Sequence, residues 1–177
     1  MPDPLDRIAA LFTGDGAREY LGEPVTVAQH LLQCAALAEE AAALPAVVAA
    51  ALLHDIGHLV GSGADNHHGD SGAGWLAAWF APAVTEPVRL HVDAKRYLCA
   101  AEPGYLALLS QASRDSLQFQ GSVMTPAQAT AFETRPYAAD AVAVRRWDDA
   151  AKDPQARVPG FDHYRSVLRP LLHRSYS

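Results

Sequence analysis

The sequence has 177 residues, of which 50% are hydrophobic, and its formal net charge is −6 at pH 7. This length allows one domain over residues 1–177 with a core that needs no disulfides. The negative charge argues against a nucleic-acid or anionic-membrane surface, and no apolar run is long enough for a transmembrane helix. We expect a cytoplasmic protein, because the N-terminus lacks the basic and apolar regions of a signal peptide.

Alanine and leucine dominate the apolar residues, and this composition favours an all-α fold. The first helix is predicted over residues 5–12. A second helix should begin after Thr26, because Gln29 completes a capping box, and it should end before Pro45. A third helix, which is apolar on nearly every face, is predicted over residues 46–60 and should be buried.

The third predicted helix is followed by a polar stretch, residues 63–70, which we predict to be a loop. Thr125 and Pro126 are typical of a helix N-cap followed by a proline in the first turn. Cys34 and Cys99 lie in apolar stretches and are expected as buried, reduced thiols. Further helices are predicted over residues 71–80, 84–100, 105–110, 113–119, 138–152 and 161–173.

The most informative residues are His54 and Asp55, which are adjacent in the apolar helix predicted over residues 46–60. Burial of an aspartate and an imidazole is costly unless these groups are paired or bind a metal ion. A carboxylate has two oxygen atoms, so Asp55 can bridge two metal ions, whereas His54 can bind only one. The pair therefore predicts a metal site inside the helical core.

Six of the eight histidines lie between positions 30 and 91, which supports this prediction. A single helical histidine is usually structural, but His30, His68 and His91 accompany a buried histidine–aspartate pair. Imidazole and carboxylate together suit iron, zinc, manganese or nickel better than calcium or magnesium. The spacing of residues alone does not say which of these metals is bound.

The pattern of histidines and aspartates resembles that of a known family. His30, the pair His54-Asp55, and Asp148 resemble the H…HD…D signature of the HD-domain superfamily. The resemblance implies an HD-domain helical bundle, with five core helices around a metal site. Most of these proteins are phosphohydrolases, and a smaller group are di-iron oxygenases.

Longer segments resemble one group within this superfamily, the PhnZ-like phosphonate oxygenases, whose type enzyme is a glycine-forming 2-amino-1-hydroxyethylphosphonate dioxygenase. The resemblance covers roughly residues 20–152. The histidine–aspartate dipeptide alone is a weak signal, but His-x-x-x-Lys-Arg-Tyr-Leu together with Arg-Arg-Trp-Asp is specific to this group. The matching segments are residues 20–26, 33–35, 91–99, 102–105 and 145–149.

The resemblance implies a dinuclear site with two iron ions in a mixed-valence Fe(II)/Fe(III) state and O2 as co-substrate. His67 competes with His68, and Asp149 with Asp148, but the family spacing favours His68 and Asp148. One iron would be held by His30, His54, Asp55 and Asp148, and the other by Asp55, His68 and His91.

The resemblance also implies cleavage of the C–P bond of a 1-hydroxy-2-aminoethylphosphonate-type substrate. The products would be phosphate and a carboxylate, either glycine or an N-methylated analogue. Lys95 follows His91 by one turn, and Arg145 precedes Asp148 by three residues, so each cation can share a helix face with a ligand. The implied phosphonate contacts are Lys95, Arg145, His58, Ser113 and Ser116, and the implied catalytic residues are His54, Asp55, His58 and Lys95.

Tyr20 and Glu23 match a family loop that covers the site, where Glu23 would receive a substrate ammonium and Tyr20 would occupy an iron position before substrate arrives. Without the resemblance, Tyr20 and Glu23 would be interpreted as part of an ordinary polar loop. Lys95 and Arg145 would be interpreted as surface charges, and Ser113 and Ser116 as helix caps.

The same residues also allow two other functions. One is a metal-dependent HD phosphohydrolase acting on a nucleotide or phosphomonoester through metal-activated water. The other is a non-catalytic binding module on a degenerate HD scaffold, although degeneration should remove ligands first and every expected ligand is present. We expect a small-molecule partner and neither nucleic acid nor membrane; the sequence does not indicate the oligomeric state.

Overall fold

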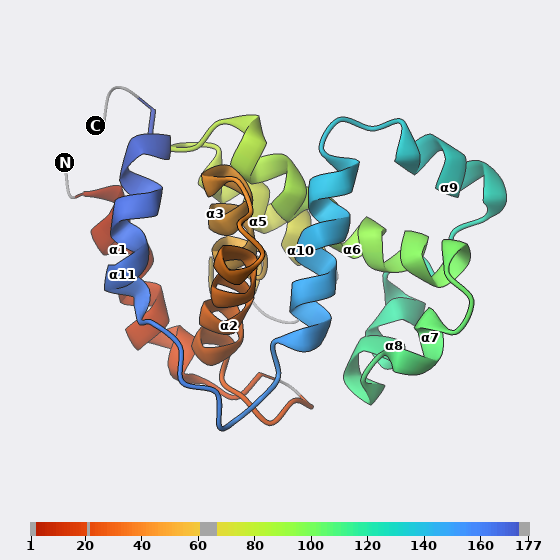
Figure 1. The fold of residues 1–177 in the computed structure, drawn as a ribbon, viewed down its shortest axis with the longest axis horizontal. Helices are drawn as coiled ribbons and strands as arrows, with labels where there is room; N and C mark the ends of the chain where they lie inside the picture. The colour runs from red at the N-terminus through yellow and green to blue at the C-terminus, as the bar shows by residue number, and fades with distance from the viewer. Residues whose placement is uncertain (1–2, 21, 61–66, 174–177) are drawn as a thin grey trace.

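The computed structural model describes residues 3–20, 22–60 and 67–173. Within these residues every regular element is a helix, and β-pairing is limited to two isolated bridges, which confirms the all-α prediction. The helices, drawn in Figure 1, are α1 (Pro4–Thr13), η1 (Asp15–Ala17), α2 (Val27–Glu40), α3 (Pro45–Leu53), α4 (Gly57–Val60), α5 (His68–Leu76), α6 (Pro82–Ala101), α7 (Tyr105–Leu108), α8 (Gln111–Phe119), α9 (Pro126–Glu133), α10 (Ala138–Ala150), α11 (Phe161–Leu168) and η2 (Arg169–Leu171).

Local capping signals set several helix starts as predicted. The Thr26 hydroxyl accepts a hydrogen bond from the backbone N–H of Gln29, whose side chain accepts from the N–H of Thr26. The same reciprocal box joins Thr125 and Gln128 at the start of α9. Each box satisfies two backbone donors that would otherwise lack a partner.

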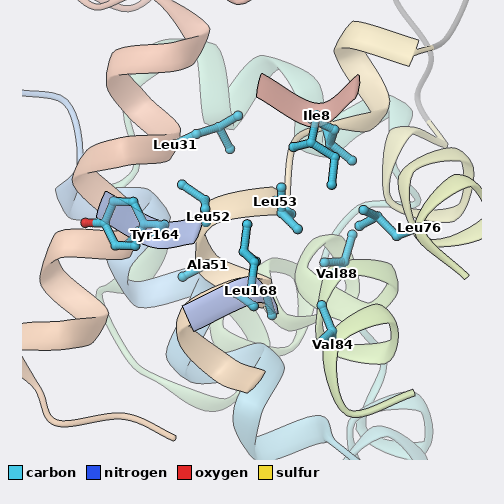
Figure 2. Close-up of a cluster of buried hydrophobic side chains, with 14 of the residues drawn as sticks. Ile8, Leu31, Ala51, Leu52, Leu53, Leu76, Val84, Val88, Tyr164 and Leu168 are labelled. Atoms are coloured by element: carbon cyan, nitrogen blue, oxygen red, sulfur yellow. The ribbon is translucent and has the colours of Figure 1, made fainter. Parts of the chain in front are cut away.

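The main core surrounds α3, whose residues 47–53 are all buried. Helices α2, α6, α10 and α11 pack around it, and Figure 2 shows Leu52 and Leu53 among buried side chains from several of these helices. A smaller core around Leu90, Phe132 and Ala141 joins α6, α9 and α10. Helices α7, α8 and α9 lie on the far side of α10 from α1 and α11 (Figure 1).

The predicted continuous helix over residues 46–60 is wrong. Helix α3 ends at Leu53, and α4 begins at Gly57 after tight turns in which Ile56 N–H donates to the Leu53 carbonyl and His58 N–H to the Asp55 carbonyl. The break brings Gly57 against the start of α5, where a Cβ would lie 2.0 Å from the carbonyl oxygen of His68, so this position requires glycine. Uniform burial gave no periodicity that could reveal the bend.

Three further predictions need correction. Residues 63–66 of the predicted polar loop lie outside the described residues, but residues 68–70 belong to α5 rather than to a loop. Helix α8 begins at Gln111 with Ser110 as its N-cap, so Ser113 lies inside the helix. Cys34 is buried as expected, whereas Cys99 is partly exposed; both are free thiols. In the described part of the chain, each helix is too short or too polar to cross a membrane.

Candidate metal centre

A first cluster of ligand atoms forms where α2, the end of α3 and α10 meet. His30 Nε2 lies 3.2 Å from His54 Nε2 and 3.4 Å from Asp148 Oδ1. Asp55 Oδ2 lies 3.5 Å from His54 Nε2 and 3.8 Å from His30 Nε2. All four residues are at most 2% exposed. Two imidazoles and two carboxylates therefore converge inside the core.

A second cluster lies on the other oxygen of Asp55. Asp55 Oδ1 is 3.2 Å from His68 Nε2 and 3.3 Å from His91 Nε2, and these two nitrogens are 3.0 Å apart. His68 opens α5, and His91 lies on α6. Asp55 therefore faces one cluster with Oδ2 and the other with Oδ1, as its predicted bridging role requires.

Backbone carbonyls fix which ring nitrogen of each imidazole faces the clusters. The Nδ1 atoms of three histidines lie at hydrogen-bond distance from backbone carbonyls, and since a carbonyl only accepts, each Nδ1 carries a hydrogen. Nε2 is therefore the nitrogen that each ring presents to its cluster as a possible metal ligand. The carbonyl partners are Ala151 for His30 at 2.9 Å, Ala51 for His54 at 2.9 Å and Val88 for His91 at 2.7 Å.

The pKa values of His54, Asp55 and Asp148 also fit cation binding, whereas at His30 burial is outweighed by the contacts with Cys34 and Asp148, which raise the pKa of that imidazole. Burial lowers the pKa of His54 to about 4, so this imidazole is neutral at physiological pH. Burial alone would raise the pKa of Asp55, but the neighbouring imidazoles of His54, His68 and His91 outweigh burial and hold it well below its usual range. The guanidinium of Arg145 likewise outweighs burial and lowers the pKa of Asp148. Neutral imidazole and ionised carboxylate are the forms that ligate a metal ion.

The structure thus brings together all six side chains that the resemblance implied as ligands. His68 is buried in the cluster, whereas its neighbour His67 is exposed. Asp148 faces the cluster, whereas Asp149 accepts hydrogen bonds from Arg145 and Tyr105. The donor set and its burial suggest a metal site.

Cys34 is a neighbour of the centre that the sequence did not indicate. Its Sγ lies 3.9 Å from His30 Nε2, within a group that also includes His54. Burial raises the pKa of the thiol, which favours the protonated form over the thiolate ligand. Its position four residues after His30, on the same helix face, was the available signal.

A cavity of about 830 Å³ opens beside the centre. The predicted residues Tyr20, Glu23, His58, Lys95 and Arg145 line it, together with Ser113 and Ser116 from α8. Of the six predicted ligands, Asp55, Asp148, His68 and His91 also face this cavity. The cavity is therefore the place where a small molecule can reach both the centre and the predicted binding residues.

Lys95 supplies a buried positive charge to this cavity. It is 2% exposed, and its Nζ donates to Ser116 Oγ at 2.8 Å and to the Ser113 carbonyl at 3.3 Å. Burial and the nearby charge of Arg145 lower the pKa of Lys95 to about 8. Two neighbouring buried cations repel each other, so Lys95 gives up its proton more readily than an exposed lysine does.

His58 lies at the side of the second cluster. Its ring stacks on His68 with 4.0 Å between centroids, and its Nε2 is 4.0 Å from Asp55 Oδ1. Its side chain is 30% exposed, which leaves it accessible from the cavity that it lines.

Tyr20 and Glu23 line the cavity from the segment before α2. The Tyr20 hydroxyl donates to Asp55 Oδ2 at 2.6 Å, and its ring stacks on His30. Glu23 Oε1 accepts hydrogen bonds from Lys152 Nζ at 2.7 Å and Ser110 Oγ at 2.5 Å. No sequence pattern indicated Lys152 or Ser110, because their contacts with Glu23 join segments far apart in the chain.

Comparison with known proteins agrees with this geometry. A model of the HD domain matches residues 27–148. The chain is 41% identical to hydroxymethylphosphonate dioxygenase of Gimesia maris, over 97% of this chain and 91% of the relative. It is 38% identical to the glycine-betaine-forming [1-hydroxy-2-(trimethylamino)ethyl]phosphonate dioxygenase of Leisingera caerulea, over 94% of this chain and 89% of the relative. With its helical fold and its buried histidine–aspartate clusters, the chain belongs to the HD domain family and resembles its phosphonate dioxygenases.

Proposed function

We propose that this protein is a di-iron oxygenase that uses O2 to cleave the C–P bond of a 1-hydroxyphosphonate. The observation that carries the proposal is the placement of Asp55, whose two oxygens face separate histidine clusters beside a cavity containing Lys95. The names of both relatives support an oxygenase over an HD phosphohydrolase. The reaction converts the hydroxyl-bearing carbon and O2 into a carboxylate, with release of phosphate and a proton.

The metal ions would be held by the two clusters already described. His30, His54, Asp55 and Asp148 would hold one ion, and Asp55, His68 and His91 the other. We propose iron in a mixed-valence Fe(II)/Fe(III) state, which would supply the electron transfer that O2 activation requires. The protein contributes neutral imidazoles fixed by backbone carbonyls, and a buried environment that limits access of water.

The phosphonate would bind at the cationic end of the cavity. Lys95 and Arg145 would balance its charge, while Ser113, Ser116 and His58 would donate hydrogen bonds to its oxygens. Lys95 Nζ donates to Ser116 Oγ, so an incoming anion would find this donor already oriented. Pre-orientation of this kind reduces the entropy cost of binding.

Tyr20 would cover the centre until substrate arrives. Its hydroxyl already donates to the Asp55 oxygen that faces His30 and His54, so it stands next to the first metal position. Glu23 would receive an ammonium group of the substrate, in exchange for its present partner Lys152. The 1-hydroxy-2-aminoethylphosphonate type, including its N-methylated forms, remains the proposed substrate with an amine. We also propose that the whole chain acts as one HD domain in the cytoplasm.

The test is turnover by anaerobically purified, iron-loaded protein. Hydroxymethylphosphonate, 1-hydroxy-2-aminoethylphosphonate and its trimethylated form should be offered with and without O2, and phosphate, carboxylate and O2 consumption measured. We expect one of them to give phosphate and carboxylate only with O2. Phosphate release without O2, or hydrolysis of a phosphomonoester by the manganese-loaded protein, would favour the hydrolase. No phosphate from any of the three would overturn the oxygenase.

The matched variant is Asp55→Ala. It removes the bridging carboxylate, so it should lose both metal ions as well as activity. Retention of two metal ions per chain in this variant would contradict the bridging role. Asp70→Ala, which removes an exposed carboxylate paired with Arg89, is the control for an aspartate outside the cavity.

A further inference from the structure

Arg145 lies between two neighbouring carboxylates on its own helix. Its Nη1 is 2.6 Å from Asp148 Oδ2, and its Nη2 donates to Asp149 Oδ1 and, at 3.2 Å, to Ser113 Oγ. The residue is 4% exposed and lines the cavity. Its Nε–H is buried without a hydrogen-bond partner among the residues that the structure describes. A buried guanidinium with a spare donor is suited to an anionic ligand.

Asp149 is held in turn from another helix. Its second oxygen accepts a hydrogen bond from the Tyr105 hydroxyl. Tyr105 opens α7, is 6% exposed and packs in a small core with Leu98 and Leu109. The hydrogen bonds thus run from Tyr105 through Asp149 to Arg145, and from there to Asp148.

This arrangement decides how Arg145 engages Asp148. Arginine usually binds a lone carboxylate through two parallel N–H donors. Here Asp149 occupies Nη2, so the short ion pair to Asp148 runs through Nη1 and Oδ2. The other oxygen of Asp148, Oδ1, lies 3.4 Å from His30 Nε2. Without Asp149, the guanidinium would be free to rotate onto both oxygens of Asp148.

We propose that Asp149, supported by Tyr105, is a positioning residue that fixes Arg145 for the phosphonate while keeping Asp148 Oδ1 available as a metal ligand. The inference rests on the proposed function, since it takes the cavity to be the phosphonate site. Asp149 touches neither the substrate nor the metal position in this scheme. It acts only through the orientation of Arg145.

The experiment compares Asp149→Ala with Asp149→Asn in iron-loaded protein. The amide of asparagine still offers an oxygen to Arg145 and can hydrogen-bond Tyr105, but it carries no charge. We expect Asp149→Ala to weaken binding of inorganic phosphate, measured by calorimetry, by roughly tenfold, the loss typical of one charge-assisted hydrogen bond. Asp149→Asn should stay within about threefold of the parent, because position rather than charge matters.

Metal retention gives a second measurement that is independent of turnover. If Arg145 competes for Asp148 in Asp149→Ala, this variant should lose iron to a chelator faster than the parent, and Asp149→Asn should not. Asp93→Ala is the matched control, because Asp93 also pairs with two arginines, Arg96 and Arg135, but lies outside the cavity. It should change neither measurement.

Two results would overturn the inference. Asp149→Ala could bind phosphate and retain iron as the parent does, or Asp149→Asn could fail as severely as Asp149→Ala. Failure of the proposed function looks different, because parent protein would then turn over no hydroxyphosphonate while the contrast between the two variants persisted. Thermal unfolding of each variant separates these effects from a loss of folded protein.

Discussion

The Tyr20 hydroxyl donates a 2.6 Å hydrogen bond to Asp55 Oδ2, the carboxylate oxygen that faces His30 and His54. Burial and the charge of Asp55 raise the pKa of Tyr20 well above its usual value, so the phenol is a neutral donor. In the absence of metal, this hydroxyl is a partner for a buried negative charge. A metal ion bound to Oδ2 would take over that role.

The first prediction is that Tyr20→Phe destabilises the metal-free protein more than the metal-loaded protein. Loss of a hydrogen bond to a charged group should cost about 1.5–3 kcal/mol without metal, and clearly less with metal. Denaturant unfolding of both forms measures the difference. Tyr97→Phe is the control, since its bond to Glu133 is exposed and should matter little in either form. Equal losses in the two forms would argue against metal at Oδ2.

The second prediction concerns pH. Because burial lowers the pKa of Lys95 to about 8, its ammonium is charged below that pH and neutral above it. An anionic phosphonate needs the charged form, so kcat/KM, which reports the free enzyme, should fall as pH rises through about 8. Lys95→Arg keeps its charge at all these pH values and should lose this descending limb. An unchanged limb in Lys95→Arg would assign it to another group.

The third prediction concerns substrate choice at Glu23. Lys152 lies 2.7 Å from Glu23, so a substrate ammonium would have to displace it. Lys152→Met should raise the ratio of kcat/KM for an aminophosphonate to that for hydroxymethylphosphonate, whereas Glu23→Gln should lower it. Lys152→Arg preserves the ion pair and serves as the control. If neither Lys152→Met nor Glu23→Gln changes the ratio, Glu23 does not receive the ammonium.

The fourth prediction concerns the bend after α3. Gly57→Ala places a methyl carbon 2.0 Å from the His68 carbonyl oxygen, so it should destabilise the protein by more than about 3 kcal/mol and weaken metal binding through His68. Gly74→Ala is the control on α5, because nothing lies within 4 Å of its Cβ, and it should stabilise the helix by up to about 1 kcal/mol. Urea unfolding and metal analysis check both variants. Parent-like stability of Gly57→Ala would show that α4 and α5 can separate without cost.

The sequence by itself determined the helical class and the start of several helices. These features depend on neighbours in the chain, such as Thr26 and Gln29 in their capping box, or on the composition of a whole segment. The pair His54-Asp55 could also be selected as candidate ligands, because a histidine–aspartate pair in an apolar segment is costly without a partner. The full set of six came from the resemblance to the HD-domain phosphonate oxygenases. Choosing His68 over His67, and Asp148 over Asp149, needed family spacing.

Only the tertiary structure decided how these groups face one another. The turn between α3 and α4 depends on a close approach to His68, and uniform apolarity hides it. Long-range contacts determine which oxygen of Asp55 faces each cluster, the pairing of Glu23 with Lys152 and the hydrogen bond from Tyr105 to Asp149. These contacts join residues separated by up to 129 positions. Such contacts leave no local trace, because side-chain chemistry fixes what a residue can bind, whereas packing of distant helices fixes which partner it meets.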